Sequence, residues 1–300
     1  MPASIPSVPP AKPWDLAVAY RIYPGIGRPP PCYGDDKLML SDFCLRSFKQ
    51  AMEGVKAKIW VLLDGCPPTY RRLFERMFPE GNLVIQELPG VGNLPTFGRQ
   101  IELLTEQADA DWVYFAEDDY FYFPGAFAEM LRQLQRQDGP DFVTPYDHLD
   151  YYTSPIHEAY SKPRPAKDRV WRPAGSSCLT FMTGRETLRQ TTPLFRSYCR
   201  GNTDLALWLS VTRHPTLFPP GALRVARRQP GLLRFLAQSW WFHPGQNARG
   251  KRWTLAAPVP TMAAHMERHY LPPGLAWDQI FSEAASAWSM PPIPAGKACA

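Results

Sequence analysis

An apolar, aromatic run at residues 112–124, Trp-Val-Tyr-Phe-Ala-Glu-Asp-Asp-Tyr-Phe-Tyr-Phe-Pro, carries three consecutive acidic side chains. The apolar part has the length and the bounding turn of a buried β-strand. Glu117, Asp118 and Asp119 would therefore emerge at its carboxyl end, where open α/β sheets bind ligands. Three carboxylates without partners would raise one another's pKa values, and a bound cation or basic side chains would relieve this repulsion. We expect a hard divalent ion that holds a diphosphate at this corner.

The residues before this run predict strands that alternate with helices, which is typical of a parallel, doubly wound sheet. We predict strands over 16–23, 57–65 and 82–88, and helices over 38–52, 68–78 and 96–107. Ser41 or Asp42 provides a start signal for the first helix. After residue 140 the regular alternation of strands and helices ends. We predict strands over 142–145, 177–182 and 223–226 with long loops between them, and helices over 204–211 and 260–269.

Composition favours a globular protein with phosphate-bearing ligands. A chain of 300 residues with 45% hydrophobic residues can bury a sizeable core, and its formal charge of +5 is too small for a dedicated nucleic-acid binder. No stretch reaches the ~18 to 20 apolar residues of a membrane helix, and the first residues do not resemble a signal peptide. The six cysteines include no Cys-x-x-Cys pair, so neither a zinc knuckle nor a disulfide framework is indicated. We expect a soluble, cytoplasmic protein with free thiols.

The order of these features resembles the GT-A glycosyltransferases, especially the family-2-like group, which use nucleotide-sugar donors. The resemblance covers roughly residues 14–280 and rests on short motifs. It implies an α/β fold of GT-A (Rossmann-like) type, with a mostly parallel central sheet flanked by helices and a loop-rich C-terminal acceptor half. We expect a Pro-rich leader (1–13), a nucleotide-sugar-binding half (14–140), an acceptor and catalytic half of the same domain (141–285) and a Pro-rich tail (286–300).

The resemblance implies four donor-binding positions outside the acidic run. The end of the first strand, Tyr20 and Arg21, would lie beside the nucleotide, and Asp64 at the end of the second strand would contact its base. Asp64 could instead cap a turn, since Gly65 follows it. Arg99 would pair with a phosphate or an acid, or lie on the helix surface without a function.

The family's Asp-x-Asp (DXD) motif maps onto Glu117-Asp118-Asp119, with Glu in the first place and Asp in the middle. The resemblance implies that Glu117 lies near the ribose and that Asp119 binds the metal, and it leaves open whether Asp118 shares the cation. It also implies that His265 completes the metal site. Carboxylates suit Mg²⁺ or Mn²⁺, and an imidazole favours Mn²⁺. The alternatives are a solvated acidic turn and a structural histidine.

Gly201-Asn-Thr-Asp-Leu-Ala-Leu-Trp-Leu resembles the family's later acidic motif, in which inverting members keep the general base. Asp204 is the candidate base, which would take the proton of the acceptor hydroxyl. The alternative is that Thr203 or Asp204 only caps the following helix.

The C-terminal half also mixes basic and aromatic residues. Aromatic faces stack on sugars or bases and arginines meet phosphates, so acceptor specificity is expected here, unless the mixture is only a solvated basic face over buried tryptophans. The residues are Arg224, Arg227, Arg228, Arg234, Trp240-Trp-Phe-His and Arg249-Gly-Lys-Arg-Trp.

These features together predict a metal-dependent, inverting glycosyltransferase of the hexosyltransferase type. It would move a sugar from a nucleoside-diphosphate donor, expected to be a UDP-sugar, to a hydroxyl of a glycan or lipid-linked glycan. Three alternatives stay open: the same transfer to a hydroxymethylated DNA base, a nucleotidyltransferase, and a non-catalytic carbohydrate-binding protein of the same fold. The sequence lacks a complete Gly-x-Gly-x-x-Gly motif, a Walker loop and a Gly-x-Ser-x-Gly elbow, which excludes dehydrogenase, P-loop and serine-hydrolase readings.

Overall fold

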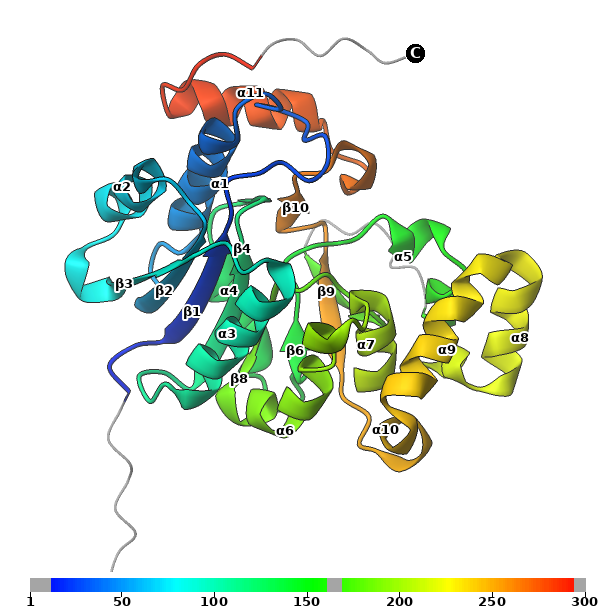
Figure 1. Cartoon of the computed structure of the whole chain (residues 1–300). Coiled ribbons are helices and arrows are strands. Elements are labelled where there is room, and N and C mark those ends of the chain that lie inside the picture. Colours follow the sequence, from blue (N-terminus) through cyan, green and yellow to red (C-terminus); the bar gives the residue numbers. More distant parts are fainter. Residues whose placement is uncertain (1–11, 161–168, 294–300) are drawn as a thin grey trace, which may run out of the picture.

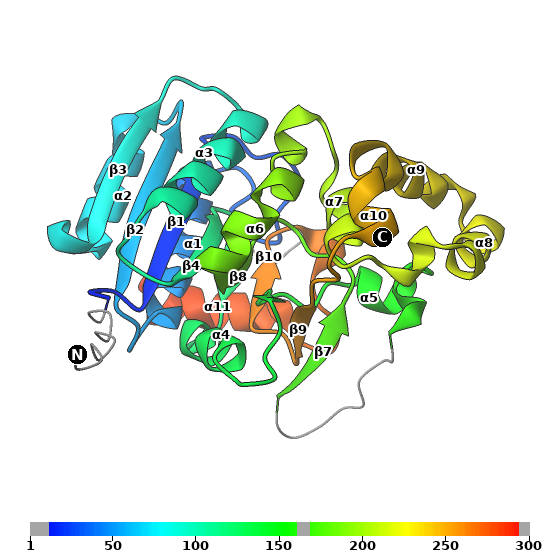
Figure 2. The same ribbon diagram turned by 90° about the horizontal axis from the view of Figure 1, so that it is seen from below.

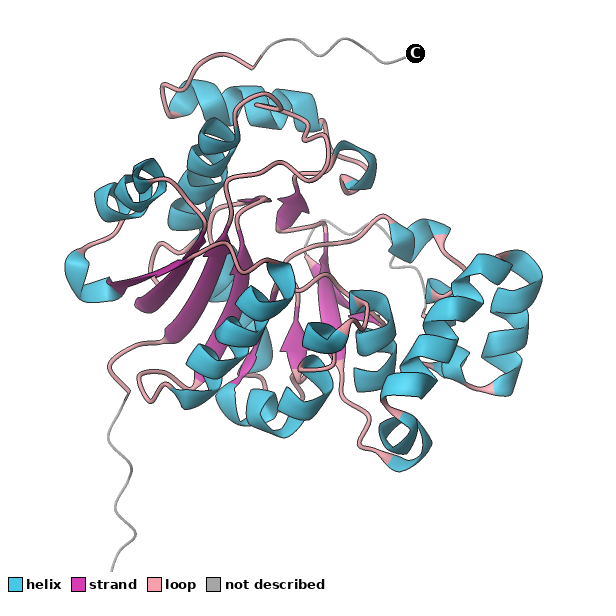
Figure 3. Cartoon of the chain, in the orientation of Figure 1, coloured by secondary structure: helices cyan, strands magenta, loops and turns pink. Residues whose placement is uncertain are grey.

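The computed structural model describes residues 12–160 and 169–293. Within them, eight strands form one sheet in the order β3-β2-β1-β4-β8-β6-β9-β7 (Figures 1 and 3). In that order the strands are Leu83–Leu88, Ala57–Asp64, Leu16–Ile22, Trp112–Glu117, Phe181–Gly184, Phe142–Val143, Leu255–Val259 and Val170–Ala174. Four of the pairings are parallel and three, β4 with β8, β8 with β6 and β9 with β7, are antiparallel. The predicted α/β class with a mostly parallel central sheet is confirmed.

Three helices connect the four parallel strands of the first half. They are α1 (Lys37–Ala51) between β1 and β2, α2 (Pro68–Met77) between β2 and β3, and α3 (Asn93–Glu106) between β3 and β4. All six of these predicted strands and helices are present, with shifted ends. The start signal for α1 was wrong, because Asp36 caps this helix and accepts the backbone N–H of Met39 at 2.9 Å.

Two layers of helices cover the two faces of the sheet (Figure 2). On one face, α1, α2 and α4 (Ala126–Leu134) bury Phe48, Phe74 and Phe127 in a core shared with Val18 and Tyr20 of β1. On the other face, α3, α6 (Arg185–Phe195) and α7 (Asp204–Val211) bury a second core, with members that include Phe97, Leu188, Phe195 and Trp208. Alternate residues of β1 belong to opposite cores, as the two-residue period of a strand requires.

The strand that leads into the three acids ends where the sequence predicts. β4 ends at Glu117, Asp118 and Asp119 form a turn, and β5 (Tyr120–Tyr122) then pairs with β10 (Ala263–His265) in a small antiparallel sheet. The three acids therefore do lie at the carboxyl end of a strand. The pairing sets His265 opposite Tyr120, directly beside the acidic turn.

Two predictions for the second half were wrong. Residues 223–226, predicted as a strand, lie in helix α8 (Pro219–Arg228), because two prolines start a helix there and Val225 alone is buried against the core. Residues 260–269, predicted as a helix, contain β10 and a short 3₁₀ turn, Arg268–Tyr270. Pro260 and Thr261 cannot propagate a helix well, and pairing with β5 uses the backbone of the following residues. In the predicted strand 177–182, only Phe181 and Met182 are in β8.

The remaining helices lie at the edges of the sheet. Helices α8, α9 (Leu233–Phe242) and α10 (Pro244–Arg249) stand beyond the end formed by β9 and β7, and α11 (Trp277–Ala287) packs on α1 (Figure 1). Helix α5 (Asp150–Thr153) and 3₁₀ turns make up the rest. The other turns are Glu80–Asn82, His157–Ala159, Tyr198–Arg200, Pro215–Leu217 and Pro230–Leu232.

Three further expectations from the sequence concern the ends of the chain, the cysteines and membrane-spanning helices. Most of the expected leader and about half of the expected tail lie outside the described residues. The five described cysteines are free thiols, as expected. Within the described parts of the chain, no helix has both the length and the apolar character needed to cross a membrane.

Candidate functional site

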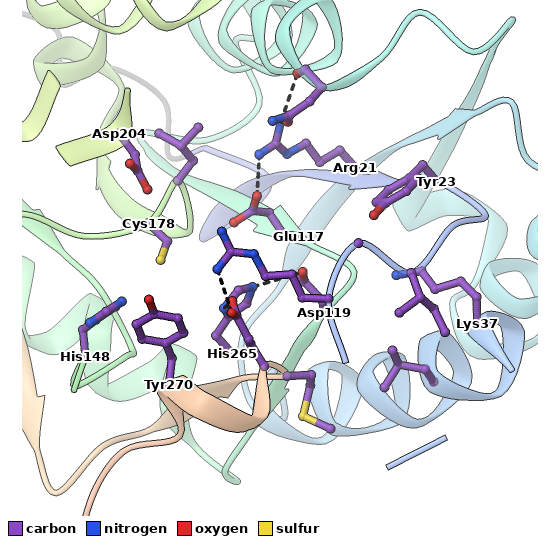
Figure 4. A pocket seen from close by; sticks show the side chains of 18 of the residues that line it. Arg21, Tyr23, Lys37, Glu117, Asp119, His148, Cys178, Asp204, His265 and Tyr270 are labelled. Atoms are coloured by element: carbon purple, nitrogen blue, oxygen red, sulfur yellow. Dashed lines mark hydrogen bonds and ion pairs between the residues drawn. The ribbon is translucent and has the colours of Figure 1, made fainter. Parts of the chain in front are cut away.

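A cavity of about 430 Å³ opens at the carboxyl end of β1 and β4 (Figure 4). Its walls come from segments far apart in the sequence: the end of β1 and the loop after it, the first turn of α1, the acidic turn, the start of α7 and the segment around β10. Lining side chains with polar groups are Arg21, Tyr23, Arg28, Lys37, Asn93, Glu117, Asp119, His148, Asp150, Cys178, Tyr198, Asp204, His265, Glu267 and Tyr270. A second cavity shares Arg21, Tyr23, Asn93, Glu117 and Asp119 with it and extends to Asp64 and Thr96.

Glu117, the first acid, is held between two strands. The guanidinium of Arg21 donates to its Oε1 and also to the side chain of Asn93, and Thr180 donates to its Oε2 at 2.7 Å. Both oxygens therefore have partners. Arg21 is 8% exposed and also lies over the ring of Phe97, so the pair is fixed in position.

Asp118, the second acid, points away from the first and pairs with Lys37 at 2.7 Å. Both side chains are almost fully buried. Burial raises the pKa of Asp118 to about 6, which still leaves it ionised at pH 7. Burial opposes the charge of Lys37, but the neighbouring carboxylate raises the pKa of this lysine. The lysine also lies over the ring of Tyr23. Because Asp118 is neutralised by Lys37, it is poorly placed to share a cation.

Asp119, the third acid, faces the cavity. Its Oδ2 lies 3.1 Å from Nε2 of His265, while its Oδ1 is buried and has no hydrogen-bond partner among the described residues. Burial alone would raise the pKa of Asp119, but His265 lowers it to about 2. Burial would likewise lower the pKa of His265, and Asp119 raises it to about 9. Glu267 extends the chain of charges, with Oε2 at 3.8 Å from Nδ1 of His265 and Oε1 at 2.7 Å from Arg28.

The acidic corner could hold a cation only with help from a ligand. In the part of the chain that the structure describes, no group of three or more His, Cys, Asp or Glu is arranged to bind a metal ion. Asp119 supplies a carboxylate whose Oδ1 atom is an unused buried acceptor, and the neighbouring His265 supplies an imidazole nitrogen once a cation has displaced its proton. Mg²⁺ and similar ions in phosphate-binding sites are commonly held by one or two carboxylates, with substrate phosphates and water completing the shell. The residues present fit that kind of site.

Asp204 lies across the cavity from Tyr23 and Lys37, beside Cys178 (Figure 4). Thr203 caps α7, because its Oγ1 accepts the backbone N–H of Ala206, so Asp204 is the first helical residue and not the cap. Its Oδ1 accepts the backbone N–H of Leu205 at 2.7 Å. Burial raises the pKa of Asp204. Its carboxylate is therefore a stronger base than that of an exposed aspartate.

The same side of the cavity carries His148 and Tyr270 (Figure 4). Their rings lie 5.4 Å apart, and Nδ1 of His148 accepts the backbone N–H of Asp150. Burial lowers the pKa of His148, so the imidazole is neutral at pH 7. The cavity thus has one side with Lys37 and an opposite side that combines the carboxylate of Asp204 with the rings of His148 and Tyr270.

Two predicted site residues line neither cavity. Tyr20 is 1% exposed, and its ring packs against Phe48 and Phe74 in the core. Arg99 lies on the surface of α3, where it donates to Gln86 and pairs with Glu102. Neither side chain is brought to the acidic corner.

Asp64 borders the second cavity, but its oxygens are already engaged. Oδ1 accepts the backbone N–H of Val91 at 2.7 Å, and Oδ2 accepts that of Gly92 at 2.8 Å. These bonds hold the turn that leads into α3. They correspond to the turn-capping role that the sequence left open.

Sequence reasoning did not identify Lys37, Arg28, Glu267 or Asn93 as site residues. A signal existed for Arg28, because Gly- and Pro-rich residues 24–34 follow a predicted strand of an α/β sheet, and such loops line ligand sites. Lys37 lies just after this loop, in the first turn of α1. Glu267 and Asn93 gave no local signal. They reach the site only through the pairing of β10 with β5 and the position of α3.

Comparisons with known proteins give no relative in sequence: no family model and no curated protein matches the chain. Among solved structures, the galactosyltransferase LgtC, in complex with donor and acceptor sugar analogues, is 11% identical, covers 92% of this chain and 97% of its own, and has a TM-score of 0.42. CMP:2-keto-3-deoxy-manno-octonic acid synthetase, complexed with CTP, is 13% identical, covers 65% of this chain and 85% of its own, and has a TM-score of 0.39. Similarity this weak carries no argument about function, which must come from the site itself.

Proposed function

We propose that this chain is a metal-dependent glycosyltransferase that moves a sugar from a nucleoside-diphosphate donor, a UDP-sugar by expectation, to an acceptor hydroxyl. The observation that carries the proposal is the acidic turn at the carboxyl end of β4. There Asp119 presents an unused buried oxygen beside His265, while Lys37 and Arg28 line the same cavity. A cation would meet the carboxylate of Asp119, and the diphosphate that it carries would meet the basic side chains of Lys37 and Arg28.

Asp119 and His265 are the proposed holders of the cation, Mn²⁺ or Mg²⁺. When bound, the ion would neutralise the charge that develops on the departing diphosphate. Arg28 and Lys37 supply further positive charge at the cavity wall, and their carboxylate partners Glu267 and Asp118 hold them in position.

Arg21, Glu117 and Asn93 are the proposed nucleotide-binding group. Their mutual hydrogen bonds leave them rigid at the boundary of the two cavities, which together are large enough for a base, a ribose and a sugar. Tyr23, 44% exposed beside Lys37, offers a ring on which a base or sugar could stack.

Asp204 is the proposed general base. A carboxylate with a raised pKa, across the cavity from the cationic wall, is placed to take the acceptor's proton as the sugar carbon is attacked from the side opposite the diphosphate. This arrangement corresponds to inversion at the anomeric carbon. His148 and Tyr270 lie on the same side and would contact the acceptor.

A donor screen with Mn²⁺, read by release of nucleoside diphosphate, tests the proposal. We expect turnover of at least one nucleotide sugar, lost in Asp119→Ala and kept in Asp138→Ala, which removes an exposed carboxylate far from the cavity. Equal turnover in Asp119→Ala and the wild type would refute the role of the acidic turn.

The same screen separates the rival functions. Release of pyrophosphate from a nucleoside triphosphate, offered together with a sugar phosphate in a parallel arm of the screen, would identify a nucleotidyltransferase, because attack would then occur at the α-phosphorus. Binding of nucleotide sugars without any hydrolysis or transfer would identify a non-catalytic protein of the same fold. Transfer to hydroxymethylated duplex DNA in preference to glycan acceptors would identify a DNA-modifying enzyme.

A further inference from the structure

Positive charge is concentrated in one continuous part of the sequence. Residues 205–266 contain none of the 28 Asp and Glu but eight of the 33 Lys and Arg, so this stretch carries +8 while the rest of the chain carries −3. Most of these basic residues lie in or beside α8, α9 and α10, which stand together at the end of the molecule opposite α2 (Figures 1 and 2).

Several of these arginines pair with no carboxylate among the described residues, although Arg234 lies over the ring of Phe235. Arg228 pairs with Glu158, and Arg213 donates to two backbone carbonyls of α10, those of Asn247 and Ala248. By contrast, Arg224, Arg227 and Arg234 are exposed, and no carboxylate among the described residues pairs with them. Their charge is available to a partner.

Exposed apolar side chains gather on the same two helices. Of the five large hydrophobic residues exposed in the described chain, three are here: Leu223 (52%), Leu233 (37%) and Trp241 (83%). On α9, Arg234, Ala237 and Trp241 follow the i, i+3, i+7 spacing of one helix face, and all three are exposed. We call Leu223, Arg224, Arg227, Leu233, Arg234 and Trp241 the α8–α9 surface.

Hydrogen bonds connect α9, the helix that carries Arg234 and Trp241, to the candidate site. Gln238 of α9 donates to the carbonyl oxygen of Gly201 at 3.1 Å, and its side-chain oxygen lies 3.0 Å from Oγ1 of Thr203. Thr203 caps α7 directly before Asp204. A partner bound at the α8–α9 surface would therefore contact a helix that is hydrogen-bonded to the loop before the proposed base.

We propose that the α8–α9 surface docks on a lipid bilayer that contains anionic phospholipids. A short helical pair with arginines and a nearly fully exposed tryptophan matches an interfacial membrane contact, in which basic residues attract anionic headgroups and indole rings sit at headgroup level. This docking proposal does not depend on the proposed glycosyltransferase function. If both hold, the acceptor is presented at the membrane.

The two leucines favour a bilayer over a nucleic acid. Arginines and a tryptophan would serve either partner, since phosphates attract the former and bases stack on the latter. Leu223 and Leu233 gain little from phosphates or sugars, but they lose their contact with water when they insert at the boundary of headgroups and acyl chains.

Vesicle flotation tests the proposal and requires no donor or acceptor. The full chain is mixed with vesicles of phosphatidylcholine containing about 30 mol% phosphatidylglycerol, and in parallel with pure phosphatidylcholine vesicles. We expect binding at least tenfold stronger to the anionic vesicles, abolished by about 0.5 M NaCl because the charges are then screened.

Two variants and a matched control locate the contact. Arg224→Gln/Arg227→Gln/Arg234→Gln should weaken binding on the order of 100-fold, at a factor of about five for each basic residue near the surface. Trp241→Ala should weaken it about tenfold. Lys49→Gln/Lys56→Gln/Arg72→Gln removes the same charge from exposed positions of the other half and should bind as the wild type does. Thermal unfolding of each variant verifies that it is folded.

The proposal is overturned if the vesicles do not bind, or if pure phosphatidylcholine binds equally well. It is also overturned if the control triple variant loses as much binding as the arginine variant. Tighter binding to duplex DNA than to anionic vesicles, with the same arginine dependence, would assign the surface to nucleic acid instead.

Discussion

At the scale of single residues, the acidic corner is a set of matched ion pairs. Glu117 pairs with Arg21, Asp118 with Lys37, and Asp119 with His265, and each basic partner comes from a different element. Carboxylates that are this close and this little exposed need such partners, because an unpaired buried charge is strongly unfavourable. Two buried oxygens of these acids lack a hydrogen bond among the described residues, Oδ2 of Asp118 and Oδ1 of Asp119. The first faces the ammonium group of Lys37, so Oδ1 of Asp119 is the one that we assign to a ligand.

The buried pair of Lys37 and Asp118 makes a prediction about stability. Lys37→Met should lower the free energy of unfolding by about 3 kcal/mol, because it leaves the carboxylate of Asp118 buried and unpaired. Lys37→Met/Asp118→Asn should recover most of this loss. Urea unfolding of the wild type and both variants provides the measurement, and a loss below about 1 kcal/mol in the single variant would contradict the pairing.

Asp204 makes a prediction about pH. Burial raises its pKa, and a general base works only when deprotonated, so kcat/KM should fall as the pH drops through a value above the ordinary range of aspartate. Asp204→Asn should remove this acid limb and slow transfer by about 10²- to 10⁴-fold with little change in donor KM. An unchanged pH profile in Asp204→Asn would show that another group is the base.

The sequence indicated part of this site. The three acids and their position at a strand end followed from the local pattern, because an apolar run that ends in acids is visible within a dozen residues. The ion pairs did not follow. Glu267 lies far along the chain from Arg28, and only the folded chain brings them to 2.7 Å.

At the scale of elements, the turn before α3 is organised by one side chain. Asp64 accepts two successive backbone N–H groups, from Val91 and Gly92, and Gly92 has a left-handed φ of 89°. The carboxylate thus satisfies donors that would otherwise be unpaired at the start of the helix.

Replacing this carboxylate separates two roles. Asp64→Ala should lower the free energy of unfolding by about 1–2 kcal/mol, because two backbone donors lose their acceptor. Thermal or urea unfolding measures this effect. If stability is unchanged while the donor KM rises, Asp64 serves the nucleotide and not the turn.

Element prediction succeeded where the sequence pattern was unambiguous. Strands β1 to β4 and helices α1 to α3 alternate at short intervals, and for each of them the hydrophobic period and the bounding turn residues predict the same element. The prediction for residues 223–226 failed because four residues are too few to distinguish a strand from one helical turn. Residues 260–269 failed because strand pairing with β5, a contact between distant segments, decided their structure.

At the scale of the whole molecule, the sheet determines where the candidate site and the basic helical end lie. The parallel half brings Arg21 and Lys37 to the acidic turn, and β10 adds His265. The later part of the chain brings Asp204 and His148 to the opposite wall of the same cavity. The acid-free residues 205–266 then form most of the helical end beyond the sheet. The basic and aromatic character of this part was visible in the sequence, but its exposure on α8 and α9 was not.

The central claim is that Asp119 and His265 hold a cation together with a nucleoside diphosphate. Electron paramagnetic resonance of Mn²⁺ measures this directly, because the signal of the free ion disappears on binding. With UDP present, the wild type and Asp138→Ala should bind one Mn²⁺ per chain, and Asp119→Ala should leave the free-ion signal unchanged. Equal Mn²⁺ binding by Asp119→Ala and the wild type would contradict the account.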